Sequence, residues 1–250
     1  MLKRSLVAIA AVCLMGVAAA CGGSKSSTPS NGAQPTKTPI PSTPTDPNAQ
    51  ELEALSQKFG TASFEVHFGI NDSGSSQPLN GFITIYKQGA DRTRFDVASN
   101  DSGETVSLIL LQTPENSVFC LPGDGTLAQL AGVEDGSGVC FKNDANSPAP
   151  DLATITNNFA QISGSDVKVS SKTTRTILGT AAMCFDYTTD GGDTKSTTCF
   201  TADGVPLYDK SVSGSDTTEL SAVQIKAQPS SDVFNPPYPV KDFPQDAGGE

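Results

Sequence analysis

The chain has 250 residues, a formal net charge of −11 at pH 7, six cysteines, one histidine and no tryptophan. This acidity opposes attraction to nucleic acid or to anionic lipid headgroups, so no nucleic-acid partner is expected. The sequence has no P-loop, GxGxxG, HExxH or GxSxG motif. The only histidine, His67, falls on the strand face opposite the apolar side chains, where a Ser-His-acid arrangement is not expected. We therefore expect no catalytic residues, no cofactor and no enzyme.

The first 20 residues have the pattern of an export signal. Lys3 and Arg4 precede an uncharged apolar run over 5–20, which includes Cys13 and is shorter than the roughly 20 residues of a membrane-spanning helix. Small residues directly before Cys21 resemble a bacterial lipobox. This resemblance implies cleavage before Cys21, a diacylglycerol on its thiol, and an extracytoplasmic protein anchored to the cell membrane by its acyl chains. The alternative is an ordinary signal peptide cut near Ala20, which would leave Cys21 unmodified.

Residues 21–47 join the lipidation site to a segment rich in Pro, Ser, Thr and Gly, which lacks the apolar side chains needed for a core. We predict a disordered tether that spans roughly 30 Å as a flexible coil. Residues 48–240 are enough for one folded domain with a sizeable core. Residues 241–250 are predicted to be a disordered tail.

The first predicted element is a helix over residues 48–59. Asn48 and Glu51 have the spacing of a capping box. Apolar and polar residues then alternate with period two over residues 64–70, as in a half-buried strand. Three further strands are predicted at 81–87, 92–97 and 105–112. A fifth strand is predicted to end at Cys120.

A second amphipathic helix is predicted over residues 151–162. Gly179 is interpreted as a bulge or break in a long strand, and residues 234–238 as an extended coil that covers a sheet edge. The remaining strands are predicted at 167–171, 175–187, 195–200, 205–213 and 218–227. About ten strands joined by short hairpins indicate a curved antiparallel sheet in an α+β, mainly β fold. The two helices are the candidates to cover its concave face.

The cysteines of the predicted domain are expected to form disulfides. Once Cys13 is cleaved off and Cys21 is lipidated, an even number remains in an exported chain. Three pairings are possible. We favour Cys120–Cys140 and Cys184–Cys199, because each pair brackets turn-rich sequence and the second is centred on a Gly-Gly hairpin signal.

Metal sites are the alternative use of these residues. The cysteines include no CxxC spacing and His67 is remote from them, so a metal site is not expected. Acid- and Gly-rich stretches at 71–76 and 186–193 lack the EF-hand spacing. They are interpreted as turns, with a structural Ca²⁺ ion as the alternative.

The order of elements resembles the LolA-type lipoprotein carriers and their lipid-anchored relatives of the LppX/LprG kind. The resemblance begins with the lipobox, the polar tether and the short helix. It then rests on segments at 64–68, 81–85, 92–95, 177–181, 199–207 and 234–237. It implies an unclosed β-half-barrel in which helices plug an apolar cavity on the concave face.

The first functional hypothesis is a carrier or binder of a lipid or lipidated ligand, held between sheet and helices in a monomer. The predicted cavity residues are Leu52, Leu55, Phe59, Leu152, Ile155 and Phe159 from the helices and Phe64, Phe68, Phe82, Leu108 and Leu110 from the strands. The alternative is that these side chains pack on one another without a cavity. The chain would then be a non-catalytic interaction or envelope-sensing module that docks on an envelope protein, a role that the resemblance also includes.

Overall fold

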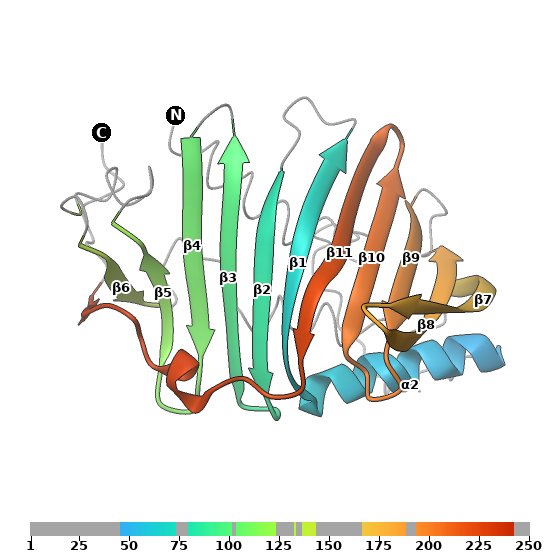
Figure 1. The fold of residues 1–250 in the computed structure, drawn as a ribbon, viewed down its shortest axis with the longest axis horizontal. Coiled ribbons are helices and arrows are strands. Elements are labelled where there is room, and N and C mark those ends of the chain that lie inside the picture. The colour runs from blue at the N-terminus through green and yellow to red at the C-terminus, as the bar shows by residue number, and fades with distance from the viewer. Residues whose placement is uncertain are drawn as a thin grey trace, which may run out of the picture.

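The computed structural model describes residues 46–73, 80–101, 104–123, 133, 137–143, 167–188 and 194–242. The predicted signal peptide, Cys21, nearly all of the tether and the predicted helix over 151–162 lie outside these residues. The described part forms one open, curved sheet of 12 strands and one α-helix, α2 (Pro47–Thr61) (Figure 1). The expectation of a mainly β, curved sheet is confirmed.

Helix α2 begins one residue before the predicted start, because Asp46 caps it. The Asp46 Oδ1 atom accepts a hydrogen bond of 2.9 Å from the backbone N–H of Asn48, and Pro47 occupies the first helical position, where a missing N–H is harmless. The predicted capping box is therefore wrong. Glu51 instead forms an ion pair with Lys172 on the sheet.

The N-terminal half of the sheet is built from consecutive antiparallel neighbours, and the C-terminal half is joined to it through the pair β1/β11 (Figure 1). The order across the sheet is β12-β6-β5-β4-β3-β2-β1-β11-β10-β9-β8-β7. The first six strands are β1 (Ser63–Ser73), β2 (Asn80–Gln88), β3 (Arg92–Asp101), β4 (Glu104–Gln112), β5 (Ser117–Leu121) and β6 (Val139–Lys142). The others are β7 (Lys168–Ile177), β8 (Thr180–Thr188), β9 (Thr194–Phe200), β10 (Pro206–Ser213), β11 (Asp216–Lys226) and β12 (Val240–Lys241).

The strand predicted over 175–187 is wrong, because the chain reverses within it. Leu178 and Gly179 have positive φ angles of 51° and 77° and form the turn between β7 and β8. Gly179 was correctly predicted to interrupt the strand. The region predicted as one strand therefore contains the end of β7, a turn and most of β8, which form a hairpin.

The C-terminal segment covers a sheet edge, but not as the predicted coil. Phe234 ends the 3-10 helix η1 (Ser231–Phe234) and is buried against β4 and β5. Arg94 on β3 holds η1 in place, because its Nη1 atom donates to the carbonyl oxygen of Val233 at 2.8 Å. Strand β12 then pairs in parallel with β6, with Lys241 opposite Phe141, so the predicted tail boundary at 241 falls inside a strand.

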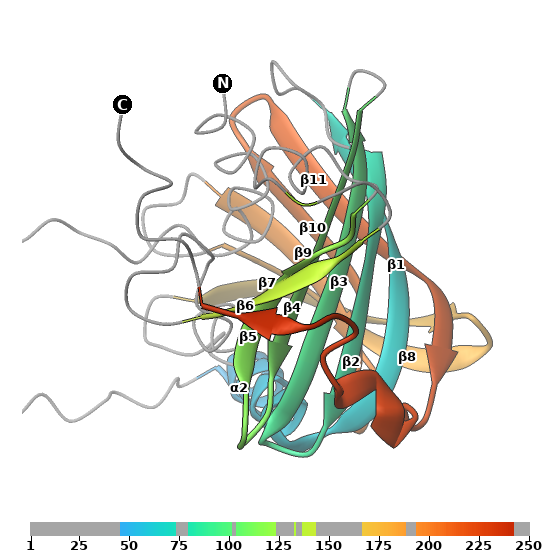
Figure 2. The ribbon, with the colours of Figure 1, turned by 90° about the vertical axis from the view of Figure 1, so that its left-hand side faces the viewer.

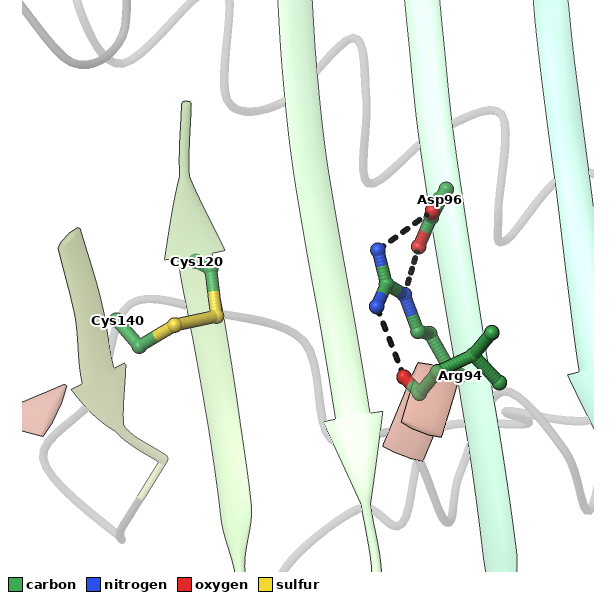
Figure 3. Close-up of a disulfide and its surroundings, with 5 residues drawn as sticks. Arg94, Asp96, Cys120 and Cys140 are labelled. Atoms are coloured by element: carbon green, nitrogen blue, oxygen red, sulfur yellow. Dashed lines mark hydrogen bonds and ion pairs between the residues drawn. A yellow bond between two sulfur atoms is a disulfide. The ribbon is translucent and has the colours of Figure 1, made fainter. Parts of the chain in front are cut away.

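Both predicted disulfides are present. Cys120 and Cys140 face each other on β5 and β6, and Cys184 and Cys199 on β8 and β9. Figure 3 shows the first of them beside the Arg94–Asp96 ion pair, whose Nε and Oδ1 atoms lie 2.6 Å apart. Each disulfide therefore crosslinks adjacent antiparallel strands.

Candidate ligand-binding face

The concave face of the sheet carries a continuous row of apolar side chains across six strands. Register pairs Val66 with Ile85, Ile85 with Phe95, and Phe95 with Leu110. The row continues through Phe119 to Phe141. All of these residues are buried and belong to the main core cluster. We call this row and the side chains beside it on the same face the inner face.

Helix α2 lies against one end of this concave side (Figures 1 and 2). Leu52 and Leu55 pack with Phe185, Tyr187 and Phe200 in a cluster of their own. At the C-terminal end of the helix the Phe59 ring meets Phe64, with ring centroids 5.8 Å apart. Within the ranges described above, no helix covers the inner face of β2 to β6.

Seven of the predicted cavity residues are described and buried. They are Leu52, Leu55, Phe59, Phe64, Phe68, Leu108 and Leu110. The structure brings the last five into the main core cluster, while Leu52 and Leu55 lie in the separate cluster beneath α2. Leu152, Ile155 and Phe159 lie outside the described residues.

Phe82 was predicted to point inward, and this is wrong. Phe82 is 61% exposed and lies opposite Gly69 and Ala98, on the convex face. Because side chains alternate along a strand, Ile83 and Ile85 take the inner positions of β2. Val223, which is 54% exposed, lies close by, and its Cγ1 atom is 3.8 Å from where a Cβ on Gly69 would be. Phe82 and Val223 therefore form a small exposed apolar patch on the convex face.

The same alternation places Lys87 on the inner face, a position that was not predicted from the sequence. Lys87 is 2% exposed. Its Nζ atom lies 3.5 Å from the Thr93 hydroxyl and 5.6 Å from the centroid of the Phe59 ring. Burial lowers the pKa of Lys87, and the negative charge of Asp91 opposes that change only in part. The sequence did contain a signal for this position, because Ile83, Ile85 and Lys87 are spaced two residues apart and therefore share one face of β2.

A second polar group lies on β8, β9 and β10. Thr198 Oγ1 donates to Asp209 Oδ2 at 2.7 Å, and the Tyr187 hydroxyl lies 3.3 Å from Thr198 Oγ1. Burial raises the pKa of Asp209 to about 6, although the hydrogen bond from Thr198 acts in the opposite direction. Burial also raises the pKa of Tyr187. Asp209 therefore holds its proton in the folded protein at mildly acidic pH.

We expect the Asp209→Asn variant to be more stable than the wild type at neutral pH. The folded-state pKa of about 6 exceeds the usual 3.8, so this carboxyl carries no penalty below about pH 4, destabilises the fold increasingly from pH 4 to pH 6, and carries its full penalty above pH 6. One pKa unit corresponds to about 1.36 kcal/mol, so the gain at pH 7 is at most about 3 kcal/mol. Urea denaturation of both proteins at pH 4 and pH 7 measures it. Asp203→Asn, at an exposed turn, is the control, and an equal gain at both pH values would contradict the prediction.

His67 lies in an ion-pair network on the convex face. Its Nε2 atom is 2.7 Å from Glu65 Oε1, and its Nδ1 atom is 3.1 Å from the Thr84 hydroxyl. Lys226 Nζ donates to the same Glu65 oxygen at 2.6 Å. Burial raises the pKa of Glu65, but the hydrogen bonds from Lys226 and His67 outweigh it and the net change is downward. The network links β1, β2 and β11.

Within the part of the chain that the structure describes, no group of three or more His, Cys, Asp or Glu side chains could hold a metal ion. None of the described helices combines the length and apolar character that crossing a bilayer requires.

Comparison with known proteins gives structural similarity alone. No family model matches the chain, and no curated protein matches it. Among solved structures, LprF from Mycobacterium bovis is 12% identical, with a TM-score of 0.47 over 79% of this chain and 100% of that one. The lipoprotein LppX of Mycobacterium tuberculosis is 12% identical, with a TM-score of 0.41 over 75% of this chain and 99% of that one.

The MucA/MucB complex of Pseudomonas aeruginosa also matches, at 14% identity and a TM-score of 0.47 over 76% of this chain. This chain spans 61% of the matched chain there. A LolA-superfamily protein from Nitrosomonas europaea matches at 9% identity, with a TM-score of 0.32 over 75% of this chain and 97% of that one.

Proposed function

We propose that the chain is an extracytoplasmic lipoprotein, anchored through Cys21, whose domain binds a lipid or another apolar ligand against the inner face. The observation that supports the proposal is the continuous row of apolar side chains from Val66 to Phe141 across six adjacent strands. The two disulfides support an oxidising compartment outside the cytoplasm. Cys21 supplies the acyl anchor that holds the domain at the membrane.

The physical basis of binding is the removal of apolar surface from water. A methylene group contributes about 0.8 kcal/mol when it is buried, so a chain of about ten methylenes supplies about 8 kcal/mol before the entropy of ordering is subtracted. The inner face offers aromatic and branched side chains on adjacent strands for such contact. These apolar side chains favour an acyl chain over a polar solute as the ligand.

Leu110→Trp tests the proposal, and Leu111→Trp is its matched control. Both leucines are 1% exposed and adjacent on β4, but Leu110 lies on the inner face and Leu111 packs against the convex cluster with Phe234. We expect Leu111→Trp to lower the free energy of unfolding by about 1–3 kcal/mol, because it overfills a packed core. Leu110→Trp should cost less stability and should abolish lipid binding, because it fills the space of the ligand.

Thermal unfolding and lipid extraction of the purified variants measure both effects. Equal destabilisation by the two tryptophans, without any change in bound lipid, would show that the inner face is packed core. The protein-interaction reading would then be favoured, and the Phe82–Val223 patch is the exposed apolar surface it would use.

A further inference from the structure

Lys87 is a buried cation on the apolar inner face. It lies opposite Phe64 on β1 and Thr93 on β3, near the end of β2 and beside the end of α2. Ile85 and Ile83 continue the same face along β2, and Val66 and Phe68 run beside them on β1. The ammonium group of Lys87 therefore lies at one end of a row of apolar side chains on β1 and β2.

Among the described residues, this ammonium group has no carboxylate within ion-pair distance, and the charge of Asp91 only partly offsets its burial. Other cations do form ion pairs with carboxylates within 4.0 Å: Arg94, Lys142, Lys172, Lys210 and Lys226. Lys87 instead has one long contact with the Thr93 hydroxyl and the face of the Phe59 ring. A buried ammonium without a close counter-ion is unfavourable, because it has lost its hydration. Within the described part of the chain, the charge of Lys87 is therefore not neutralised by a carboxylate in direct contact.

We propose that Lys87 binds the anionic headgroup, a carboxylate or a phosphate, of an amphiphile whose acyl chain lies along the inner face. This inference rests on the proposed lipid-binding function and adds the charge of the ligand and the position of its head. The anion supplies the missing counter-charge, and the Thr93 hydroxyl is close enough to donate a second hydrogen bond. The tail then runs from Phe64 toward Phe68 and Ile83.

The test compares laurate with dodecanol, which has the same chain length without the charge. The protein is the chain from position 21 onward with Cys21→Ser, delipidated by solvent, and calorimetry measures the two dissociation constants. We expect laurate to bind about 10- to 100-fold more tightly than dodecanol, the range of a hydrogen bond to a charged group. Lys87→Met should bring the ratio of the two dissociation constants to about one.

Lys210→Met is the matched control, because it removes one positive charge from a position paired with Glu219 across β10 and β11. It should leave the preference for laurate intact. Lys87→Met should fold, because an apolar side chain of similar volume replaces a desolvated charge, and thermal unfolding checks this.

The remaining outcomes would overturn the proposed function, the role of Lys87 or the lipid headgroup. Binding of neither compound by the Cys21→Ser protein would overturn the proposed function itself. Equal affinity for laurate and dodecanol, or an equal loss in Lys87→Met and Lys210→Met, would overturn the role of Lys87 alone. Displacement of laurate by inorganic phosphate without a tail would assign the site to a free anion and overturn the lipid headgroup.

Discussion

Gly204→Ala is expected to destabilise the domain by about 3 kcal/mol, because it combines backbone strain with a clash against α2. Gly204 has a φ angle of +79° in the turn between β9 and β10. A Cβ there would lie 2.6 Å from Lys58 Cβ and 2.7 Å from the carbonyl oxygen of Leu55. The turn and the helix backbone are both fixed, so neither can move away without losing contacts between α2 and the sheet.

Gly214→Ala separates the two contributions. Gly214 has a φ angle of +61°, and its added Cβ would meet no atom within 4 Å. We expect only the strain, about 1 kcal/mol, in this variant. Urea denaturation of both variants measures the difference, and equal losses would contradict the tight packing of the Gly204 turn on α2.

Removal of either disulfide is expected to lower the free energy of unfolding by about 3 kcal/mol. Cys184 and Cys199 are separated by 15 residues, and Cys120 and Cys140 by 20. Opening loops of these lengths returns similar conformational entropy to the unfolded chain. The paired alanine variants, measured by denaturation against a Cys21→Ser control, test this. A loss below about 1 kcal/mol for either pair would contradict a stabilising crosslink of that size.

The sequence predicted buried faces and a disulfide correctly where its pattern allowed only one interpretation. Period two along β1 predicted its inner residues, Phe64 and Phe68, and they are buried. The Gly-Gly turn signal predicted the Cys184–Cys199 pair, which is present. The apolar side chains at Leu52, Leu55 and Phe59 predicted the buried side of α2.

The error at Phe82 came from a strand with apolar residues on both faces. Residues 81–85 offer Phe82 on one face and Ile83 and Ile85 on the other, so alternation alone does not choose. The register with β1 decides, because it places Phe82 opposite Gly69, which has no side chain to cover it. Lys87 was missed for the same reason, since the choice of face at Phe82 turned Lys87 outward.

Other misses needed information from distant parts of the chain. Residues 175–187 read as one strand, and only the positive φ angle at Leu178 shows that a non-glycine residue enters the turn. Strand β12 has two residues and exists through its pairing with β6, about a hundred positions away in the sequence. No local pattern reports such a contact.

Native mass spectrometry is the most direct test of lipid binding by this domain. The chain from position 21 onward with Cys21→Ser, expressed into an oxidising compartment, retains both disulfides and Asp46, which caps α2. We predict an excess mass that organic solvent extracts as an anionic lipid and that Leu110→Trp eliminates. A clean mass of the polypeptide alone, with both disulfides formed and no lipid taken up from added vesicles, would contradict it.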